Sequence, residues 1–216
     1  MKYPHAIARN DDAQDAVELY RKVLSAQPDK SVTIVTIGFF SNLAHLMDSK
    51  SDEFSNLNGK ELVRKKVKQL VSMAAGVGSD GAGFREFNVL VDAPSSQKVF
   101  ANWPTPILLS GFEIGHKILT GKRLISNSSL QNSPVKDAFL IALNADKNTE
   151  GRHSWDQTAV LIAVRGAQPY FNVRKINFEI KDDGTSVVIP GERFSYLVEK
   201  MPSKDVANVI EDLMMR

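Results

Sequence analysis

The sequence predicts an α/β fold in which a mostly parallel sheet is flanked by helices. The clearest sign is residues 32–37, Val-Thr-Ile-Val-Thr-Ile, a β-branched run typical of a strand buried on both faces. Segments with helical spacing of apolar residues alternate with such strands as far as residue 110, which is the rhythm of crossover connections. The composition, 43% apolar and 24% charged over 216 residues, is that of a globular chain.

The first half of the chain alternates helix and strand. Apolar residues recur at helical spacing after Asp12, and Pro28 follows the expected stop. The 32–37 strand ends at Gly38, and a second buried strand ends at Met73. The expected elements are, in order, a helix at 12–26, a strand at 32–37, a helix from 42 to 47, a strand at 69–73, a helix at 93–101 and a strand at 107–110.

The second half predicts a different arrangement, with a β-hairpin near the C-terminus. Strands at 175–181 and 186–189 are separated by Asp182-Asp183-Gly184, an Asp-Gly turn signal. Helices are expected at 135–144 and 157–164, and an amphipathic closing helix at 204–215. Because the sequence contains no internal repeat or low-complexity linker, we expect a single domain over residues 1–216.

Charge and composition exclude several classes of protein. A formal net charge of +2 gives no general reason to expect nucleic acid as a partner. The absence of cysteine excludes disulfides and thiolate chemistry. No apolar run reaches the roughly 18 residues of a membrane span, and the N-terminus lacks the apolar core of a secretory signal. These features predict a cytoplasmic protein without membrane contact, and leave a processed periplasmic or secreted form open.

Polar residues that could bind a ligand follow the glycine-rich segment 76–83. Its glycines would let backbone amides approach a ligand, although a plain connecting loop explains them as well. Glu86 and Asn88, one residue apart, could point together at hydroxyl groups. A carboxylate accepts hydroxyl protons and an amide both donates and accepts, which suits a sugar. The alternative is a surface Glu and a turn Asn.

Two acidic positions also admit both a structural and a functional interpretation. Asp156 either caps a helix N-terminus or coordinates a hard cation such as calcium. The acidic residues of 10–12 and Asp15 lie where a helix N-terminus favours negative charge. We favour the cap for the second group, because no apolar strand precedes it as a metal-binding strand-end loop requires.

Four stretches follow one another in a distinctive order. They are Thr33–Ala44, preceded by Asp15-Ala16-Val17 and containing a Gly turn and a Ser-Asn-Leu-Ala helix start, then Val71–Gly76, Glu86-Phe87-Asn88 followed by Asp92-Ala93, and Trp155–Val160. Together they cover most of the chain, and in this order they resemble the later two-thirds of an inosine–uridine-preferring nucleoside hydrolase. The set in order is far more specific than any one motif.

The resemblance implies an α/β nucleoside hydrolase fold and an N-ribohydrolase activity. The family hydrolyses the N-glycosidic bond of ribonucleosides through an oxocarbenium-like transition state. Glu86 and Asn88 would then hydrogen-bond the ribose hydroxyls. Met73 would line the sugar, and Phe87 would lie near the ribose or the base.

The resemblance also implies calcium as the cofactor. In the family this ion holds the ribose hydroxyls and the attacking water, which a divalent cation acidifies and orients. Asp156 would be one calcium ligand, and the backbone carbonyl of Ile37 another. A carbonyl ligand does not depend on the side chain, so isoleucine is compatible with that role.

Two departures from the family pattern bear on activity. The family begins with a strand and an Asp-x-Asp-x-x-x-Asp-Asp loop, which supplies further calcium ligands and the general base; this sequence lacks both, and Asn10-Asp11-Asp12 has the wrong spacing. The catalytic base is therefore unknown, and calcium binding is expected to be weak or absent without that loop. Trp155 stands where many members place a histidine that protonates the leaving base. Tryptophan could stack on the base instead.

The missing first strands also have a packing consequence. Without them the sheet is expected to expose a strand edge or apolar surface, which folded proteins usually cover. We therefore expect a separate N-terminal segment or a homo-oligomer, with a ribonucleoside as the small-molecule ligand. Three functions stay open: a nucleoside hydrolase, an inactive ribose- or nucleoside-binding module, and a scaffold used for interactions.

Overall fold

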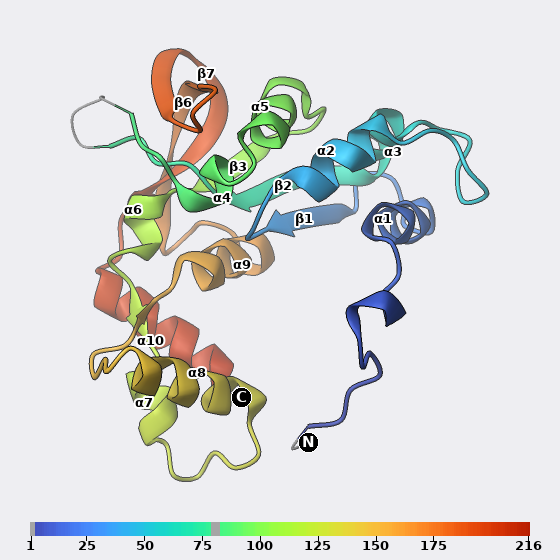
Figure 1. The fold of residues 1–216 in the computed structure, drawn as a ribbon. Helices are drawn as coiled ribbons and strands as arrows, with labels where there is room; N and C mark the ends of the chain where they lie inside the picture. Colours follow the sequence, from blue (N-terminus) through green and yellow to red (C-terminus); the bar gives the residue numbers. More distant parts are fainter. Residues whose placement is uncertain (1–2, 79–82) are drawn as a thin grey trace.

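The computed structural model describes residues 3–78 and 83–216, and it is built around a five-stranded sheet with the order β1-β2-β3-β7-β6 (Figure 1). The first four strands in this order are parallel to their neighbours, and β6 pairs antiparallel with β7. This confirms the predicted mostly parallel sheet with a C-terminal hairpin. The strands are β1 (Val32–Thr36), β2 (Val67–Met73), β3 (Ile107–Ser110), β6 (Phe171–Ile180) and β7 (Ser186–Glu199).

Helices flank the sheet and connect its strands, as the alternating pattern predicted (Figure 1). A short two-stranded sheet pairs β4 (Leu119–Thr120) with β5 (Arg152–His153) beside α6 and α9. The helices are α1 (Ala16–Ser25), α2 (Ser41–Asp48), α3 (Gly59–Lys66), α4 (Phe87–Leu90), α5 (Ala93–Asn102), α6 (Phe112–Gly115), α7 (Lys122–Ser126), α8 (Pro134–Ala145), α9 (Trp155–Arg165) and α10 (Ser203–Met214), with a 3-10 turn at Asn10–Asp12. None of the described helices is long and apolar enough to cross a membrane.

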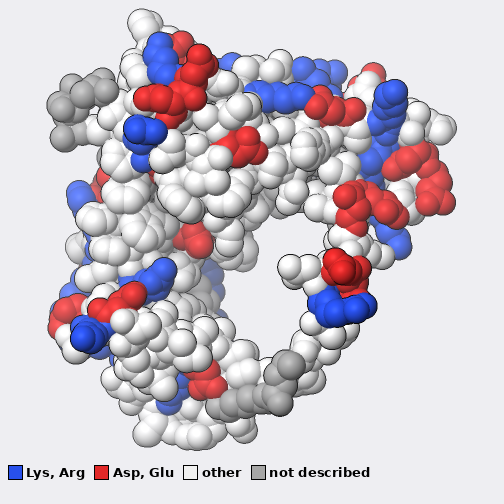
Figure 2. All heavy atoms as spheres, viewed as in Figure 1, with Lys and Arg blue, Asp and Glu red and all other residues white. Residues whose placement is uncertain are grey.

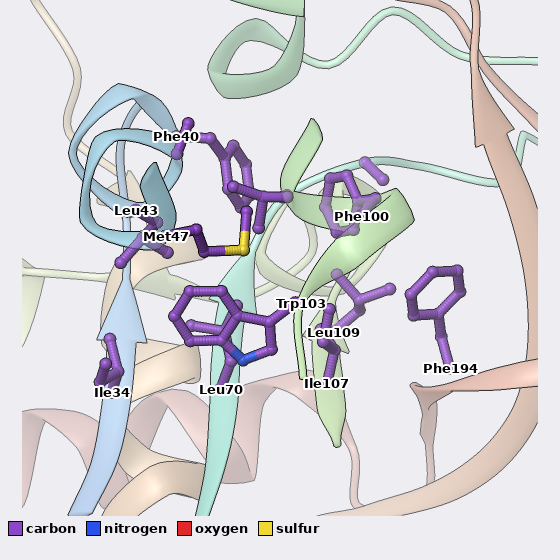
Figure 3. Packing of buried hydrophobic residues seen from close by; sticks show 14 of the residues in the cluster. Ile34, Phe40, Leu43, Met47, Leu70, Phe100, Trp103, Ile107, Leu109 and Phe194 are labelled. Atoms are coloured by element: carbon purple, nitrogen blue, oxygen red, sulfur yellow. The ribbon is translucent and has the colours of Figure 1, made fainter. Parts of the chain in front are cut away.

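The β-branched strands bury both faces because helices cover both sides of the sheet. On one side Leu70 and Leu109 pack with α2 and α5, where the Phe40 and Phe100 rings lie 4.9 Å apart (Figure 3). On the other side Val71 packs with α9 and α10. Successive strand residues point to opposite faces, so each strand feeds both cores.

Some elements differ from the predictions because of contacts that local patterns do not report. The first helix begins at Ala16, since the Asp15 carboxylate caps it by accepting from the Val17 and Glu18 amides at 2.9 Å. This confirms the capping role predicted for Asp15. The second hairpin strand continues well past Ile189, because its later residues pair with β3. The predicted loop at 76–83 includes residues 79–82, which lie outside the described residues.

A buried arginine holds the polar segment between α2 and α3 against α1. The Arg21 side chain is 3% exposed, and its guanidinium donates to both Asp52 carboxylate oxygens at 2.5 and 2.9 Å. It also donates to the backbone carbonyls of Ser55 and Leu57. The hydrogen bond from Arg21 is the main cause of the lowered pKa of Asp52. One cation thus organises a loop that contains little apolar surface.

Replacing Asp52 with alanine is expected to lower the free energy of unfolding by about 3 kcal/mol, because it leaves a buried guanidinium without its counter-charge. Urea denaturation measures this change. Asp212→Ala is the matched control. It removes the carboxylate of a surface ion pair with Arg123, in which the Arg123 and Asp212 side chains are 47% and 56% exposed. That variant should lose less than about 1 kcal/mol. Equal losses in the two variants would contradict the organising role of Arg21.

Candidate functional site

The candidate site lies where β2 ends, and it brings Met73 and Asn88 into direct contact. The Asn88 Nδ2 amide donates to the Met73 backbone carbonyl at 3.1 Å and lies 3.2 Å from its sulfur. Ala75, two residues after the strand, has a φ of 62°, an unusual left-handed conformation for a residue with a side chain. The strand end is therefore turned sharply toward α4, which carries Asn88.

The connection that follows this strand is tied to the hairpin on both sides of residues 79–82. The Ser186 hydroxyl donates to the Gly76 carbonyl at 2.8 Å and lies 2.9 Å from the Phe84 carbonyl. The backbones of Phe84 and Ser186 exchange two further hydrogen bonds. Glu86 is thus placed at the end of the sheet by contacts with a strand more than a hundred residues away in sequence.

Glu86 is buried, with 3% of its surface exposed, and its carboxylate caps α4. The two carboxylate oxygens accept from the backbone amides of Asn88 at 3.0 Å and Val89 at 3.3 Å. Burial raises the pKa of Glu86, and these backbone hydrogen bonds oppose the shift without cancelling it. Asn88 is 8% exposed. The alternative of a surface Glu and a turn Asn is therefore wrong.

Both polar side chains are held rigidly by hydrogen bonds. The Asn88 Nδ2 is committed to Met73, whereas its Oδ1 accepts no hydrogen bond from the described residues. The Glu86 carboxylate is held by backbone amides, of which those of Asn88 and Val89 lie closest. Both side chains lie near the carboxyl end of a parallel strand, which is where α/β sheets usually hold ligands.

An exposed aromatic pair stands beside these polar groups. Phe87 is 65% exposed and Phe39 is 45% exposed, and their ring centroids lie 5.9 Å apart. Phe39 follows β1 and Phe87 is the first residue of α4, so this ring contact links the end of β1 to the start of α4. The proximity of Phe39 was not predicted, because nothing local in Gly-Phe-Phe-Ser indicates which ring turns outward.

Asp156 and Ile37 line one cavity of about 480 Å³, together with residues of α9 and α10. Ser154, not Asp156, occupies the N-cap position of α9, so the capping interpretation of Asp156 is wrong. Its carboxylate makes no hydrogen bond or ion pair with the described residues. Burial raises the pKa of Asp156, and the charge of Arg152 partly opposes this effect.

These residues do not by themselves complete a calcium site. Calcium takes six to eight oxygen ligands, whereas Asp156 and the Ile37 carbonyl would provide one carboxylate and one carbonyl. Within residues 3–78 and 83–216, no group of three His, Cys, Asp or Glu side chains could hold a metal ion. The donor set of the described residues therefore does not fit calcium, and any further ligands must come from elsewhere.

Trp155 belongs to an aromatic cluster that the sequence did not reveal. Its ring stacks on Phe112 with 5.3 Å between centroids, and His153 lies 4.8 Å away on a tilted plane. The Trp155 Nε1 donates to the Phe112 carbonyl at 2.9 Å. His153 in turn stacks on His116 at 4.4 Å. Contact of Trp155 with a ligand remains a prediction, and the cluster holds its ring in one orientation.

Glu86→Gln is expected to change how stability depends on pH. Because its pKa is raised by burial, the folded chain binds this proton more tightly than the unfolded chain does. The contribution of Glu86 to the free energy of unfolding therefore falls as pH rises from its ordinary pKa of 4.5 to the raised value. The variant lacks this fall, so its stability relative to the natural chain should rise with pH across that window.

Urea denaturation at a series of pH values between about 4 and 8 measures the difference. Asp156, whose pKa is also raised, contributes equally to both chains and cancels. Glu192→Gln makes the same chemical change at an exposed position of β7 and is the control. A constant difference between the Glu86→Gln variant and the natural chain at all pH values would contradict the buried carboxylate.

Comparison with known proteins identifies a family for this chain. A family model described as "Inosine-uridine preferring nucleoside hydrolase" matches residues 2–212. No curated protein matches the chain. The matched residues include Glu86, Asn88 and Asp156 of the candidate site.

Solved structures share the fold at low sequence identity. A plant nucleoside hydrolase has a TM-score of 0.65 and 16% identity, over 99% of this chain and 70% of that one. The inosine-uridine preferring nucleoside hydrolase of Bacillus anthracis has a TM-score of 0.63 and 17% identity, over 94% and 66%. The type III effector protein XopQ, complexed with adenosine diphosphate ribose, has a TM-score of 0.62 and 13% identity, over 97% and 68%. The chain thus spans about two thirds of the length of these structures.

Proposed function

The chain belongs to the inosine-uridine preferring nucleoside hydrolase family, and on that premise we propose that its site binds ribonucleosides and serves hydrolysis of their N-glycosidic bond. The observation that carries the proposal is the burial of Glu86 and Asn88 together at the end of β2. The backbone amides that bond the Glu86 carboxylate offset only part of its desolvation, so further hydrogen bonds from a ligand would stabilise its charged form. Ribose hydroxyl groups would supply them.

The proposed division of contacts follows from what each side chain offers. Glu86 accepts hydrogen bonds from the ribose hydroxyl groups. Its carboxylate suits this role because the backbone amides of α4 hold it in one orientation. Asn88, tied through Nδ2 to Met73, presents Oδ1 as a second acceptor. Phe87 and Phe39 supply an apolar surface beside them for the ring of the sugar or the base.

Hydrolysis needs more than these contacts. A water molecule adds its oxygen to the anomeric carbon and gives up a proton to a base. The carbon–nitrogen bond breaks, its electron pair stays on the nucleobase, and a proton is delivered to that nitrogen. The described residues bind and orient the sugar, whereas no general base is assigned among them. We therefore propose that the general base and the further carboxylates of hydrolysis come from outside this set.

A second function, ribosyl binding without hydrolysis, is favoured by one specific observation. No group of three acidic or histidine side chains that could hold a metal is present in the described part of the chain. The structure of the XopQ effector, which has the same fold, is of a complex with adenosine diphosphate ribose. A site that retains only the sugar contacts is consistent with this role.

Glu86→Gln is expected to weaken ribose binding about tenfold or more, because hydrogen bonds to a charged group contribute roughly 1.5–3 kcal/mol. Isothermal titration with ribose and with inosine measures the change. Glu192→Gln, the same substitution on the exposed part of β7, should bind as the natural chain does.

A hydrolysis assay with inosine and uridine separates the two functions. Release of free base by the purified chain that disappears in the Glu86→Gln variant would identify a complete enzyme and contradict binding without turnover. Ribose affinity that Glu86→Gln leaves unchanged would remove Glu86 from the site.

A further inference from the structure

α4, which carries Asn88 and is capped by Glu86, is a single turn of helix that other parts of the chain must hold in place. It covers only Phe87–Leu90, and so short a helix is not stable by itself, because nucleation costs more than a few hydrogen bonds return. Its start is fixed by Glu86 and by the bond from Asn88 to β2. Whatever fixes Leu90, at its other end, therefore bears on both polar residues.

The turn of the β6–β7 hairpin, residues 181–185, packs directly against the end of α4. Its Gly184 is buried and has a φ of 79°. A Cβ atom at this position would lie 2.7 Å from the Leu90 Cα and 3.2 Å from its Cδ1, distances that the backbone of α4 could not tolerate without moving. Glycine therefore serves two purposes here, since it permits the left-handed turn and lets the turn touch the helix backbone.

Hydrogen bonds attach the same turn to the segments on both sides of α4. Before the helix, the Arg85 Nε donates to the Asp183 carbonyl at 3.2 Å. After it, the Gln97 side chain of α5 donates to the Ile180 carbonyl and to the Asp182 carboxylate, both at 3.0 Å. Three contacts from different residues thus fix the turn against the part of the chain that carries the candidate site.

The outer side of the hairpin offers no comparable support. Asp182 and Asp183 are exposed, and Lys181 forms an exposed ion pair with Glu179. Charged side chains of both signs lie over the β6–β7 hairpin (Figure 2). Because exposed ion pairs contribute little to stability, the inner contacts with α4 and its neighbours determine where the turn lies.

We propose that the turn of the β6–β7 hairpin is a positioning element for the ribose contacts, and that Gly184 sets the place of α4 through its contact with Leu90. The proposal rests on the proposed function, in which Glu86 and Asn88 bind the ribose hydroxyl groups. α4 moves as one turn, so a shift of Leu90 also moves the backbone amides that hold the Glu86 carboxylate. The turn itself touches no ligand and acts through α4.

Gly184→Ala tests the contact, and Gly166→Ala is the matched control. Gly166 has a φ of 81°, but a Cβ atom there would meet nothing within 4 Å among the described residues. Both variants place alanine at a positive φ, and only Gly184→Ala displaces α4. Without any ligand, hydrogen exchange of the Asn88 and Val89 amides should be about tenfold faster in Gly184→Ala than in Gly166→Ala.

Ribose titration tests the consequence for binding. Gly184→Ala should weaken ribose affinity about tenfold, because small displacements of positioning groups are costly, whereas Gly166→Ala should bind as the natural chain does. Made in the Glu86→Gln chain, Gly184→Ala should weaken binding much less, since its effect passes through that carboxylate. A loss of global stability alone would act equally in both backgrounds.

Ser186→Ala is a second variant, in case Gly184→Ala does not fold. It adds no volume and removes the hydroxyl that bonds the Gly76 and Phe84 carbonyls beside the turn. It should weaken ribose affinity in the same direction by about threefold. Unchanged affinity and unchanged exchange of the α4 amides in Ser186→Ala would contradict the proposal.

Three other results would overturn it. The α4 amides exchange equally in Gly184→Ala and Gly166→Ala; or the two variants bind ribose equally; or Gly184→Ala weakens binding as much in the Glu86→Gln chain as in the natural one. A natural chain that binds no ribose would refute the proposed function instead. The exchange measurement needs no ligand, so it decides the positioning role by itself.

Discussion

The hydrogen bond from the Asn88 amide to the Met73 carbonyl is the contact on which the candidate site depends. It joins the end of β2 to the start of α4, and it also fixes which way Asn88 presents its free oxygen. β2 is an interior strand that feeds both cores, with Leu70 on one side and Val71 on the other. Any shift of this strand in the sheet would therefore move the polar groups of the site.

The same region shows how a costly buried carboxylate is accommodated. Glu86 is inside the protein, where burial raises its pKa, yet two backbone amides of α4 hold it in place. The helix cap compensates part of the desolvation. The left-handed backbone of Ala75 and the hydrogen bond from Ser186 to Gly76 fix the chain between β2 and Glu86. A site built this way is preorganised before any ligand arrives.

Asp156 presents the opposite situation. It is exposed and lines an apolar groove, and its carboxylate has no hydrogen bond or ion pair with the described residues. Ile37, the other residue with a proposed calcium role, lines that groove as well. The sugar side of the proposed site is thus supported by two hydrogen-bonded residues, whereas the proposed metal side adjoins an apolar groove.

The sequence by itself determined the alternation of the main strands and helices up to β3, the hairpin at Asp182-Asp183-Gly184, and the cap at Asp15, because these depend on side chains within a few residues. It did not indicate the short elements α3, α4, α6, α7, β4 and β5. The family resemblance, carried by ordered motifs, was confirmed by the family model. Only the tertiary structure decided that Glu86 is buried, that Ser154 rather than Asp156 occupies the N-cap position of α9, and that Trp155 lies among Phe112 and His153. Those outcomes depend on contacts between segments tens of residues apart, and burial is a property of the whole packing that no local pattern contains.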